Sequence, residues 1–232
     1  MAGHPWAGSH PAIRDTLAGI GRQHGTPARR AATNGTAEIR KLVATCTDSL
    51  TGTRDRALLL LGFAAALRRS ELVAVLREHI PLTREGLRLL IPRARTDQAG
   101  RGAELGIPRG RKLETCPVRG ALEAWLQAGD RRYGPVFRRI DRCGNLETTA
   151  LHPYALPKIL ARRLALAGIK PAGLERLPLH GLRAGFITEA YQAGARDEAI
   201  MEHSCHRDIR TMRGYVRRAK LVDESPAGLA GF

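Results

Sequence analysis

An uncharged apolar run, Ala57–Leu67, limits what this chain can fold into more than any other feature of its sequence. The run spans eleven residues, well short of the roughly 20 that a membrane-spanning helix needs, so it predicts a helix buried in a globular core. Thr53 can cap this helix at its start, and the helix is expected to end near Arg68. With 232 residues in all, the chain is long enough for one to two domains of about 150 residues each.

The segments around this helix predict a mainly α fold with one small β element, an α+β protein. Between residues 78 and 108 short apolar runs alternate with polar turns, which indicates a small three-stranded antiparallel sheet. Ile39, Leu42 and Val43 share one helical face in a helix that starts near Thr36. Further helices are expected over Ser70–Leu76, Pro117–Gly129 and Pro153–Ala167, and from about Gly181, Arg196 and Asp208.

The two ends of the chain differ from this central part. Residues 1–35 are rich in Gly, Pro, His and Arg and show only one short amphipathic stretch, Ile13–Ile20, so they are expected to be a linker or the remnant of another domain. Residues 222–232 form a C-terminal tail. No apolar segment follows a basic start, so we expect no secretory signal and a cytoplasmic protein. The scattered cysteines form no Cys-x-x-Cys pair and are expected to be reduced thiols: Cys46, Cys116, Cys143 and Cys205.

The charge of the chain points to nucleic acid as the partner. There are 38 Lys and Arg against 22 Asp and Glu, which gives a formal net charge of +16. Only five of the basic residues are Lys, and the planar fork of Arg suits bidentate contacts with phosphate. Nucleic acid therefore ranks ahead of an anionic membrane and of small acidic substrates. A GC-rich genome also favours Arg, so the composition alone leaves this choice open.

Four short motifs carry candidate chemistry. In chain order they are Arg68 within Leu67–Leu72, the polar turn at residues 94–102, His180 with Arg183, and His206 nine residues before Tyr215. Taken singly, each has an ordinary structural interpretation. Arg68 suits an ion pair at a helix end, His180 a helix cap or a core position, and Tyr215 the face of an amphipathic basic helix. Their order and joint spacing in a basic chain favour one shared site.

In these motifs the sequence resembles the tyrosine recombinase (phage integrase) family, over roughly residues 36–221. Members have an Arg in a Leu-Arg-x-x-Glu-Leu box, a Lys on a β-hairpin, a His-x-x-Arg box, a further His or Trp, and a Tyr nine residues beyond it. The resemblance implies the catalytic-domain fold of that family. It assigns the catalytic positions to Arg68, Arg95, His180, Arg183, His206 and Tyr215.

The sequence departs from the family pattern in three places. Arg95 stands where the hairpin Lys is expected, and Ser204-Cys205-His206 stands where Thr-Gly-His is more typical. The third departure is an expected one: residues 1–35 resemble only the tail of the family's N-terminal core-binding domain. Because Arg stays protonated at any ordinary pH, Arg95 is expected to be a poor general acid.

The resemblance implies attack of the Tyr215 phenol on a DNA phosphodiester, which gives a 3′-phosphotyrosyl link and a free 5′-hydroxyl. The guanidinium forks of Arg68 and Arg183 can bind the two non-bridging oxygens, on which negative charge develops, without a metal ion. A neutral imidazole can accept the phenolic proton, and His180 is the candidate. His206 would donate a hydrogen bond to the same oxygens. Neither ATP nor Mg²⁺ nor any other cofactor is required.

The leading hypothesis is a site-specific DNA recombinase or integrase of a mobile element, acting on double-stranded DNA as a homo-tetramer and without a membrane partner. A type IB topoisomerase is the alternative with similar chemistry. A truncated or decayed integrase that binds DNA without cleaving it is the alternative from another class, and a metal site at His203, Cys205 and His206 is a further one. The expected DNA contacts, mostly to phosphates, are Arg93, Arg101, Arg109, Arg111, Lys112, Arg207, Arg210 and Arg213.

Overall fold

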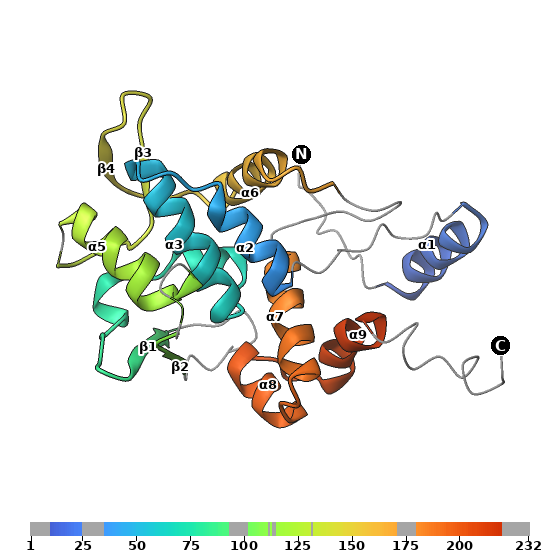
Figure 1. Cartoon of the computed structure of the whole chain (residues 1–232). Helices are drawn as coiled ribbons and strands as arrows, with labels where there is room; N and C mark the ends of the chain where they lie inside the picture. The colour runs from blue at the N-terminus through green and yellow to red at the C-terminus, as the bar shows by residue number, and fades with distance from the viewer. Residues whose placement is uncertain are drawn as a thin grey trace. The chain divides into compact units, whose positions relative to one another are not determined.

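The computed structural model describes residues 10–24, 35–92, 102–110, 112, 115–130, 132–170 and 180–219, with the backbone alone at 180 and 217–219 (Figure 1). The chain forms two compact units, Met1–Arg30 and Ala31–Phe232. The first unit contains helix α1 (Pro11–His24), which buries no side chain. The second unit contains all the other elements. No helix within the described ranges is long and apolar enough to cross a membrane.

Helix α3 (Leu50–Ala64) forms the centre of the second unit, as the apolar run predicts (Figure 1). Leu58, Leu59 and Leu61 are fully buried, where α3 packs against α2, η3, α5 and α7. The mainly α prediction is confirmed. The other helical elements are α2 (Thr36–Ala44), α4 (Arg69–Val73), η1 (Arg77–His79), η3 (Pro117–Leu122), α5 (Glu123–Gly129), α6 (Ala155–Leu166), α7 (His180–Gln192), α8 (Asp197–Ser204) and α9 (Ile209–Ala219).

The start of α3 differs from the prediction. The helix begins one turn earlier, and Ser49 is its cap, because the Ser49 side chain accepts a hydrogen bond from the backbone N–H of Gly52 at 3.1 Å. Thr53 instead lies inside the helix and donates its hydroxyl to the Ser49 carbonyl at 3.1 Å. Gly52 allows this tight entry, since a Cβ there would lie 2.1 Å from the carbonyl oxygen of Thr47.

The predicted three-stranded sheet has two strands, β1 (Gly86–Ile91) and β2 (Ala103–Pro108), which pair in antiparallel register. The third strand is reduced to one isolated bridge between Leu82 and Leu87. Pro81 explains this, because proline has no backbone N–H to donate to a neighbouring strand. Residues 93–101, in the connection between β1 and β2, lie outside the described part of the chain.

A second hairpin, β3 (Arg138–Ile140) with β4 (Leu146–Ala150), is absent from the sequence prediction. Its turn is held by Asp141, whose Oδ1 accepts hydrogen bonds from two backbone N–H groups, of Cys143 and Asn145, each at 2.8 Å. The described part of the chain thus has two separate two-stranded antiparallel sheets, β1–β2 and β3–β4.

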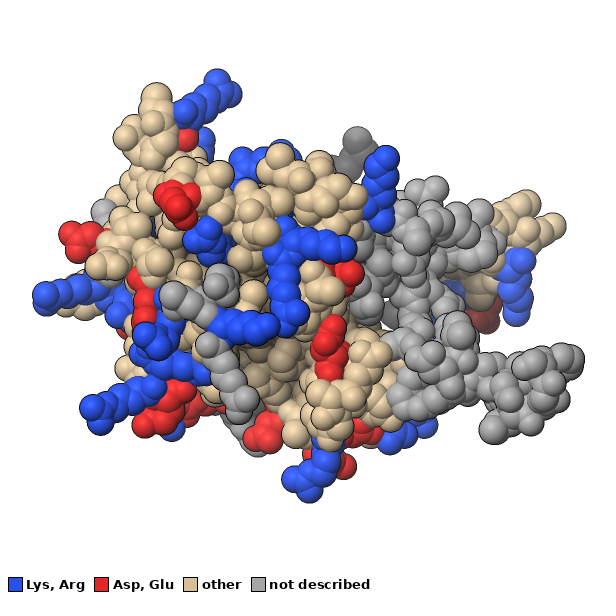
Figure 2. All heavy atoms as spheres, viewed as in Figure 1, with Lys and Arg blue, Asp and Glu red and all other residues tan. Residues whose placement is uncertain are grey.

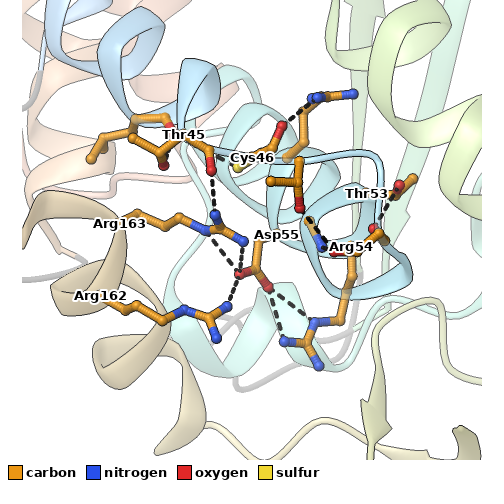
Figure 3. Close-up of polar contacts among 12 residues, drawn as sticks. Thr45, Cys46, Thr53, Arg54, Asp55, Arg162 and Arg163 are labelled. Atoms are coloured by element: carbon orange, nitrogen blue, oxygen red, sulfur yellow. Dashed lines mark hydrogen bonds and ion pairs between the residues drawn. The ribbon is translucent and has the colours of Figure 1, made fainter. Parts of the chain in front are cut away.

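A buried ionic cluster joins α3 to α6 (Figure 3). The carboxylate of Asp55 is fully buried. Its Oδ1 accepts hydrogen bonds from Arg54 at 2.9 and 3.2 Å, and its Oδ2 accepts from Arg162 at 2.6 Å and from Arg163 at 2.8 and 3.0 Å. Arg163 also donates to the carbonyl of Thr45 at 2.6 Å, after the end of α2. One carboxylate therefore holds three guanidinium groups that come from two helices.

Helices α7, α8 and α9 enclose a small apolar core of their own, apart from the main one. Its buried members among the described residues are Ile187, Ile200, Met212 and Val216, and six partly buried side chains, Tyr215 among them, pack against these. Figure 1 shows these three helices gathered at one end of the second unit. Within the described part of the chain, the helix that carries Tyr215 is thus attached to α7 and α8 largely through this small core.

Candidate active site

Arg68 lies in the turn between α3 and α4, directly before the shorter helix. Ala66 reverses the chain in this turn with a positive φ of 49°. Glu71 holds Arg68 in place, because its carboxylate accepts hydrogen bonds from the Arg68 backbone N–H at 2.8 Å and from Nη1 at 2.7 Å. The Arg68 side chain keeps some exposure to solvent, 19%. An arginine side chain has five N–H donors, and among the described residues Glu71 accepts from one nitrogen of the Arg68 guanidinium.

Arg183 lies in the first turn of α7 and is almost completely buried, with 2% of its surface exposed. Its Nη1 donates to the carbonyl of Ala66 at 2.6 Å, and its Nη2 donates to the carbonyl of Ser204. Nη2 also lies 3.2 and 3.1 Å from the two ring nitrogens of His206. Arg183 therefore connects the α3–α4 turn to the end of α8. Backbone carbonyls at both places hold its guanidinium group in position.

The ring of His206 is oriented by Ser204. The Ser204 hydroxyl donates to the Ile200 carbonyl at 2.5 Å and lies 2.7 Å from Nδ1 of His206. A hydroxyl has one proton to donate, so at this contact it accepts, and Nδ1 of His206 carries the hydrogen. In the neutral imidazole Nε2 is then the acceptor and faces Arg183.

Tyr215 lies on α9 with its ring next to His206. The two ring centroids are 6.0 Å apart and the ring planes are inclined by 56°. Burial raises the pKa of the Tyr215 phenol, while the charges of Arg183 and Arg68 act in the opposite direction. The phenol is therefore protonated at neutral pH, and it needs a base to become a nucleophile.

The cluster of Arg68, Arg183, His206 and Tyr215, called the Arg–His–Tyr cluster below, holds excess positive charge. Burial, and next the charge of Arg68, lower the pKa of Arg183 to about 10. Among the described residues, Glu71 is the carboxylate that offsets the two cations. Nε of Arg183 is a buried donor that has no partner among the described residues. Two guanidinium groups held in this way, with donors unused, form a site for an anion with several oxygens, such as a phosphate.

Cys205 occupies a backbone conformation that favours glycine. It ends α8 with φ of 52° and ψ of 43°, in the left-handed region. The family pattern Thr-Gly-His has a Gly at this position. The left-handed conformation explains that preference, since Gly has no Cβ to clash there. The left-handed residue turns the chain so that the Ser204 carbonyl meets Arg183 and the His206 ring follows.

The other predicted catalytic residues lie outside the described side chains. Arg95 falls in the 93–101 segment, and of His180 only the backbone is described, as the first residue of α7. His203, part of the alternative metal site, is engaged elsewhere: its Nε2 lies 2.8 Å from the carbonyl of Ala64, and its ring stacks on Phe186. Within the described residues, no group of three or more His, Cys, Asp or Glu is arranged to hold a metal ion.

The predicted DNA contacts divide into three groups. Arg93, Arg101 and Arg111 lie outside the described residues. Arg109 binds Glu123 at 2.8 Å and Arg213 binds Asp197 at 2.7 Å, so both take part in intramolecular ion pairs, and the Arg213 side chain is 57% exposed. Lys112, Arg207 and Arg210 are exposed as well.

Lys112 lines a groove of about 740 Å³ between α2, the start of α3 and the start of η3. Three arginines also line it, Arg40, Arg56 and Arg119. Figure 2 shows Lys and Arg atoms gathered over α2 and α3 on the visible face. Of the four, Arg56 binds the Cys46 carbonyl at 2.6 Å. The side chains of the other three have no ion pair with any residue that the structure describes, so this basic groove offers unneutralised charge.

Two supporting residues of the cluster were not singled out from the sequence. Glu71 stands in the Leu-Arg-x-x-Glu-Leu box, and its position three residues after Arg68 is the spacing at which side chains meet over one helical turn. Ser204 stands where a Thr is more typical, and its partners Ile200 and His206 lie four residues before and two residues after it, at the end of α8.

Comparison with known proteins identifies the family. A model described as the phage integrase family matches residues 35–221. An integrase/recombinase XerD homolog of Selenomonas ruminantium is 34% identical over 181 residues, which cover 77% of this chain and 51% of that protein. Tyrosine recombinase XerC of Pseudomonas aeruginosa is 32% identical over 176 residues, which cover 72% of this chain and 48% of that protein. The chain thus spans about half the length of these curated relatives.

Solved structures share the fold. The XerH site-specific recombinase bound to a palindromic difH substrate, in a post-cleavage complex, has a TM-score of 0.67 at 16% identity, covering 90% of this chain and 56% of that one. A lambda integrase dimer bound to a COC′ core site has a TM-score of 0.58 at 11% identity, covering 87% of this chain and 56% of that one. With the family match over residues 35–221, these findings show that the chain belongs to the phage integrase family of tyrosine recombinases.

Proposed function

We propose that this chain is the catalytic part of a site-specific DNA recombinase, which cleaves and rejoins DNA strands through Tyr215. The observation that carries the proposal is the Arg–His–Tyr cluster. In it the Tyr215 phenol lies near the guanidinium groups of Arg68 and Arg183, and the single carboxylate of Glu71 offsets only part of their charge. The names of its relatives, recombinases and integrases, support the same reaction class.

In the proposed reaction the Tyr215 oxygen attacks a phosphodiester phosphorus. A P–O bond to the tyrosine forms and the P–O5′ bond breaks, which leaves a 3′-phosphotyrosyl link and a free 5′-hydroxyl. Arg68 and Arg183 bind the non-bridging oxygens through their unused N–H donors, where charge grows in the transition state. Rejoining is the reverse step with a 5′-hydroxyl of another strand, so the covalent link conserves the bond energy and no nucleotide cofactor or metal takes part.

Two protons must move in this step. The phenolic proton of Tyr215 goes to a base, for which we propose His180, and the departing 5′-oxygen receives a proton from an acid. Arg95 stands at the position of that acid in the family pattern and is a poor proton donor. Nε2 of His206 now faces Arg183. To donate a hydrogen bond to a phosphate oxygen, Nε2 must carry a proton and must exchange its contact with Arg183 for one with the phosphate.

The wider organisation is part of the same proposal. Residues 36–221 would form the catalytic domain, residues 1–35 a linker or remnant of a core-binding domain, and residues 222–232 a tail. The substrate would be double-stranded DNA in the cytoplasm of a bacterium, bound by a homo-tetramer. Support comes from the bacterial relatives and from a net charge of +16.

The alternatives make different predictions. A decayed integrase would bind DNA without forming a covalent link, whereas the cluster retains Arg183 in contact with His206, the Tyr215 ring next to His206, and Arg68 close enough to act on the pKa of Arg183 and Tyr215. A type IB topoisomerase would relax supercoiled DNA without regard to sequence, and the similarity to recombinases and integrases favours strand exchange over relaxation.

A covalent trapping assay tests the proposal. A nicked duplex that loses a short fragment on cleavage should accumulate a protein–DNA adduct that survives denaturation. Tyr215→Phe removes only the phenolic oxygen and should abolish the adduct, with DNA affinity within a few-fold of the wild type. Tyr133→Phe, at a side chain that is 76% exposed, is the matched control and should leave the adduct intact. An adduct that survives in Tyr215→Phe, or none with the wild type on any cognate site, overturns the proposal.

A further inference from the structure

The attachment of α9 to its neighbours determines where the Tyr215 phenol lies. Met212 and Val216, four residues apart on one face of α9, enter the small core that α7 and α8 also line. Among the described residues this core has four buried and six partly buried side chains, so it is small, and a further contact between α9 and its neighbours adds to the docking free energy.

One further contact is an ion pair between α9 and α8. Arg213 donates from Nε and Nη2 to Oδ2 of Asp197, at 2.8 and 2.7 Å. Asp197 is the first residue of α8 and its side chain is only 13% exposed. The Arg213 side chain is 57% exposed, so the pair lies at the edge of the helix interface, where its carboxylate end is shielded from water.

We propose that Arg213 and Asp197 are positioning residues for the nucleophile, and that their ion pair holds α9 in the orientation that brings Tyr215 to Arg183. This inference rests on the proposed function. Residues two apart on a helix do not face each other, so Arg213 acts on Tyr215 through the helix and not by contact. The pair therefore changes the fraction of molecules in which the phenol is in place, and it leaves the phosphate-binding donors unchanged.

The sequence alone suggests a different role for Arg213, that of a phosphate contact. The two roles give opposite expectations for Asp197→Asn. If Arg213 contacts DNA, removing Asp197 frees the guanidinium and lowers the local negative charge, so DNA binds more tightly and cleavage is not slowed. If the pair positions α9, Asp197→Asn slows cleavage as Arg213→Gln does, and neither change weakens DNA binding much.

The experiment measures the single-turnover rate of adduct formation at saturating DNA, together with DNA affinity at several salt concentrations. Asp197→Asn and Arg213→Gln should each reduce the rate by about two- to fivefold, the range that a partly exposed pair supports. The double variant should be no slower than either single one, because both remove the same interaction. Arg213→Lys keeps the charge and should recover part of the rate.

Glu198→Gln is the matched control, because Glu198 lies in the same first turn of α8 and is exposed. It removes the same charge from the start of the helix, and because Glu198 acts on Arg213 by charge alone and less strongly than Asp197, it should slow the rate clearly less than Asp197→Asn does. The positioning role is overturned if Asp197→Asn cleaves as fast as the wild type, if its rate loss equals that of Glu198→Gln, or if Arg213→Gln loses affinity and salt dependence in proportion to rate. A wild type without any adduct refutes the proposed function instead.

Discussion

Replacing Asp55 by Asn should destabilise the protein far more than any exposed ion pair could. Five guanidinium hydrogen bonds end on this carboxylate, and two of its partners, Arg54 and Arg163, are themselves only 6% and 4% exposed. An Asn side chain has one oxygen to accept bonds and presents an NH₂ group to donors. Two buried cations then lose their counter-charge, and breaking a buried pair in this way costs about 3–5 kcal/mol.

Arg162→Gln provides the internal comparison for that magnitude. Arg162 binds the same carboxylate at 2.6 Å, but its side chain is 51% exposed, so its loss should cost under about 1 kcal/mol after screening by solvent. The free energies of unfolding of the two variants are measured by denaturant titration against the wild type. Asp55→Asn within about 1 kcal/mol of the wild type, or no worse than Arg162→Gln, would refute the account of this cluster.

Three other changes have expected outcomes. Cys205→Gly should stabilise the protein by roughly 0.5 kcal/mol, since relief of the left-handed conformation outweighs the added freedom of the unfolded chain; Cys205→Ala, which keeps the Cβ, should bring no such gain. Arg95→Lys should accelerate cleavage of an ordinary phosphodiester, but much less that of a substrate with a 5′-bridging sulfur, and equal effects on both would argue against an acid at this position. Arg40→Gln and Arg119→Gln in the basic groove should each lower the slope of log affinity against log salt by about 0.9, whereas Arg142→Gln, exposed in the β3–β4 turn, should leave it unchanged.

Much of the fold and of the site was predictable because local rules operate there. The apolar run identified α3, and Gly168, with φ of 66°, follows the end of α6 at the predicted place. His206 and Tyr215, nine residues apart in the sequence, have neighbouring rings in the structure, because Tyr215 lies on the continuous helix α9 that begins shortly after His206. Chemistry that depends on spacing along one or two elements can be read from sequence.

The rest depends on contacts between distant residues. Arg54, Asp55 and Arg56 resemble a solvated charged stretch, and only the approach of Arg162 and Arg163, more than a hundred positions away, makes Asp55 a buried counter-ion. No local pattern encodes such a pairing.

The ion pair of Arg213 has the same origin, since no local pattern places Asp197 of α8 beside a basic residue of α9. The β3–β4 hairpin was missed because its strands have three and five residues, too few for an alternating pattern to stand out.

The most direct test of the central claim is to identify the residue that carries the DNA. After trapping on a nicked duplex and digestion of both DNA and protein, mass spectrometry of the nucleotide-bearing peptide locates the link. The account predicts a single modified residue, Tyr215, out of four tyrosines in the chain. A nucleotide attached to Tyr133, Tyr154 or Tyr191, or to a serine, would contradict it.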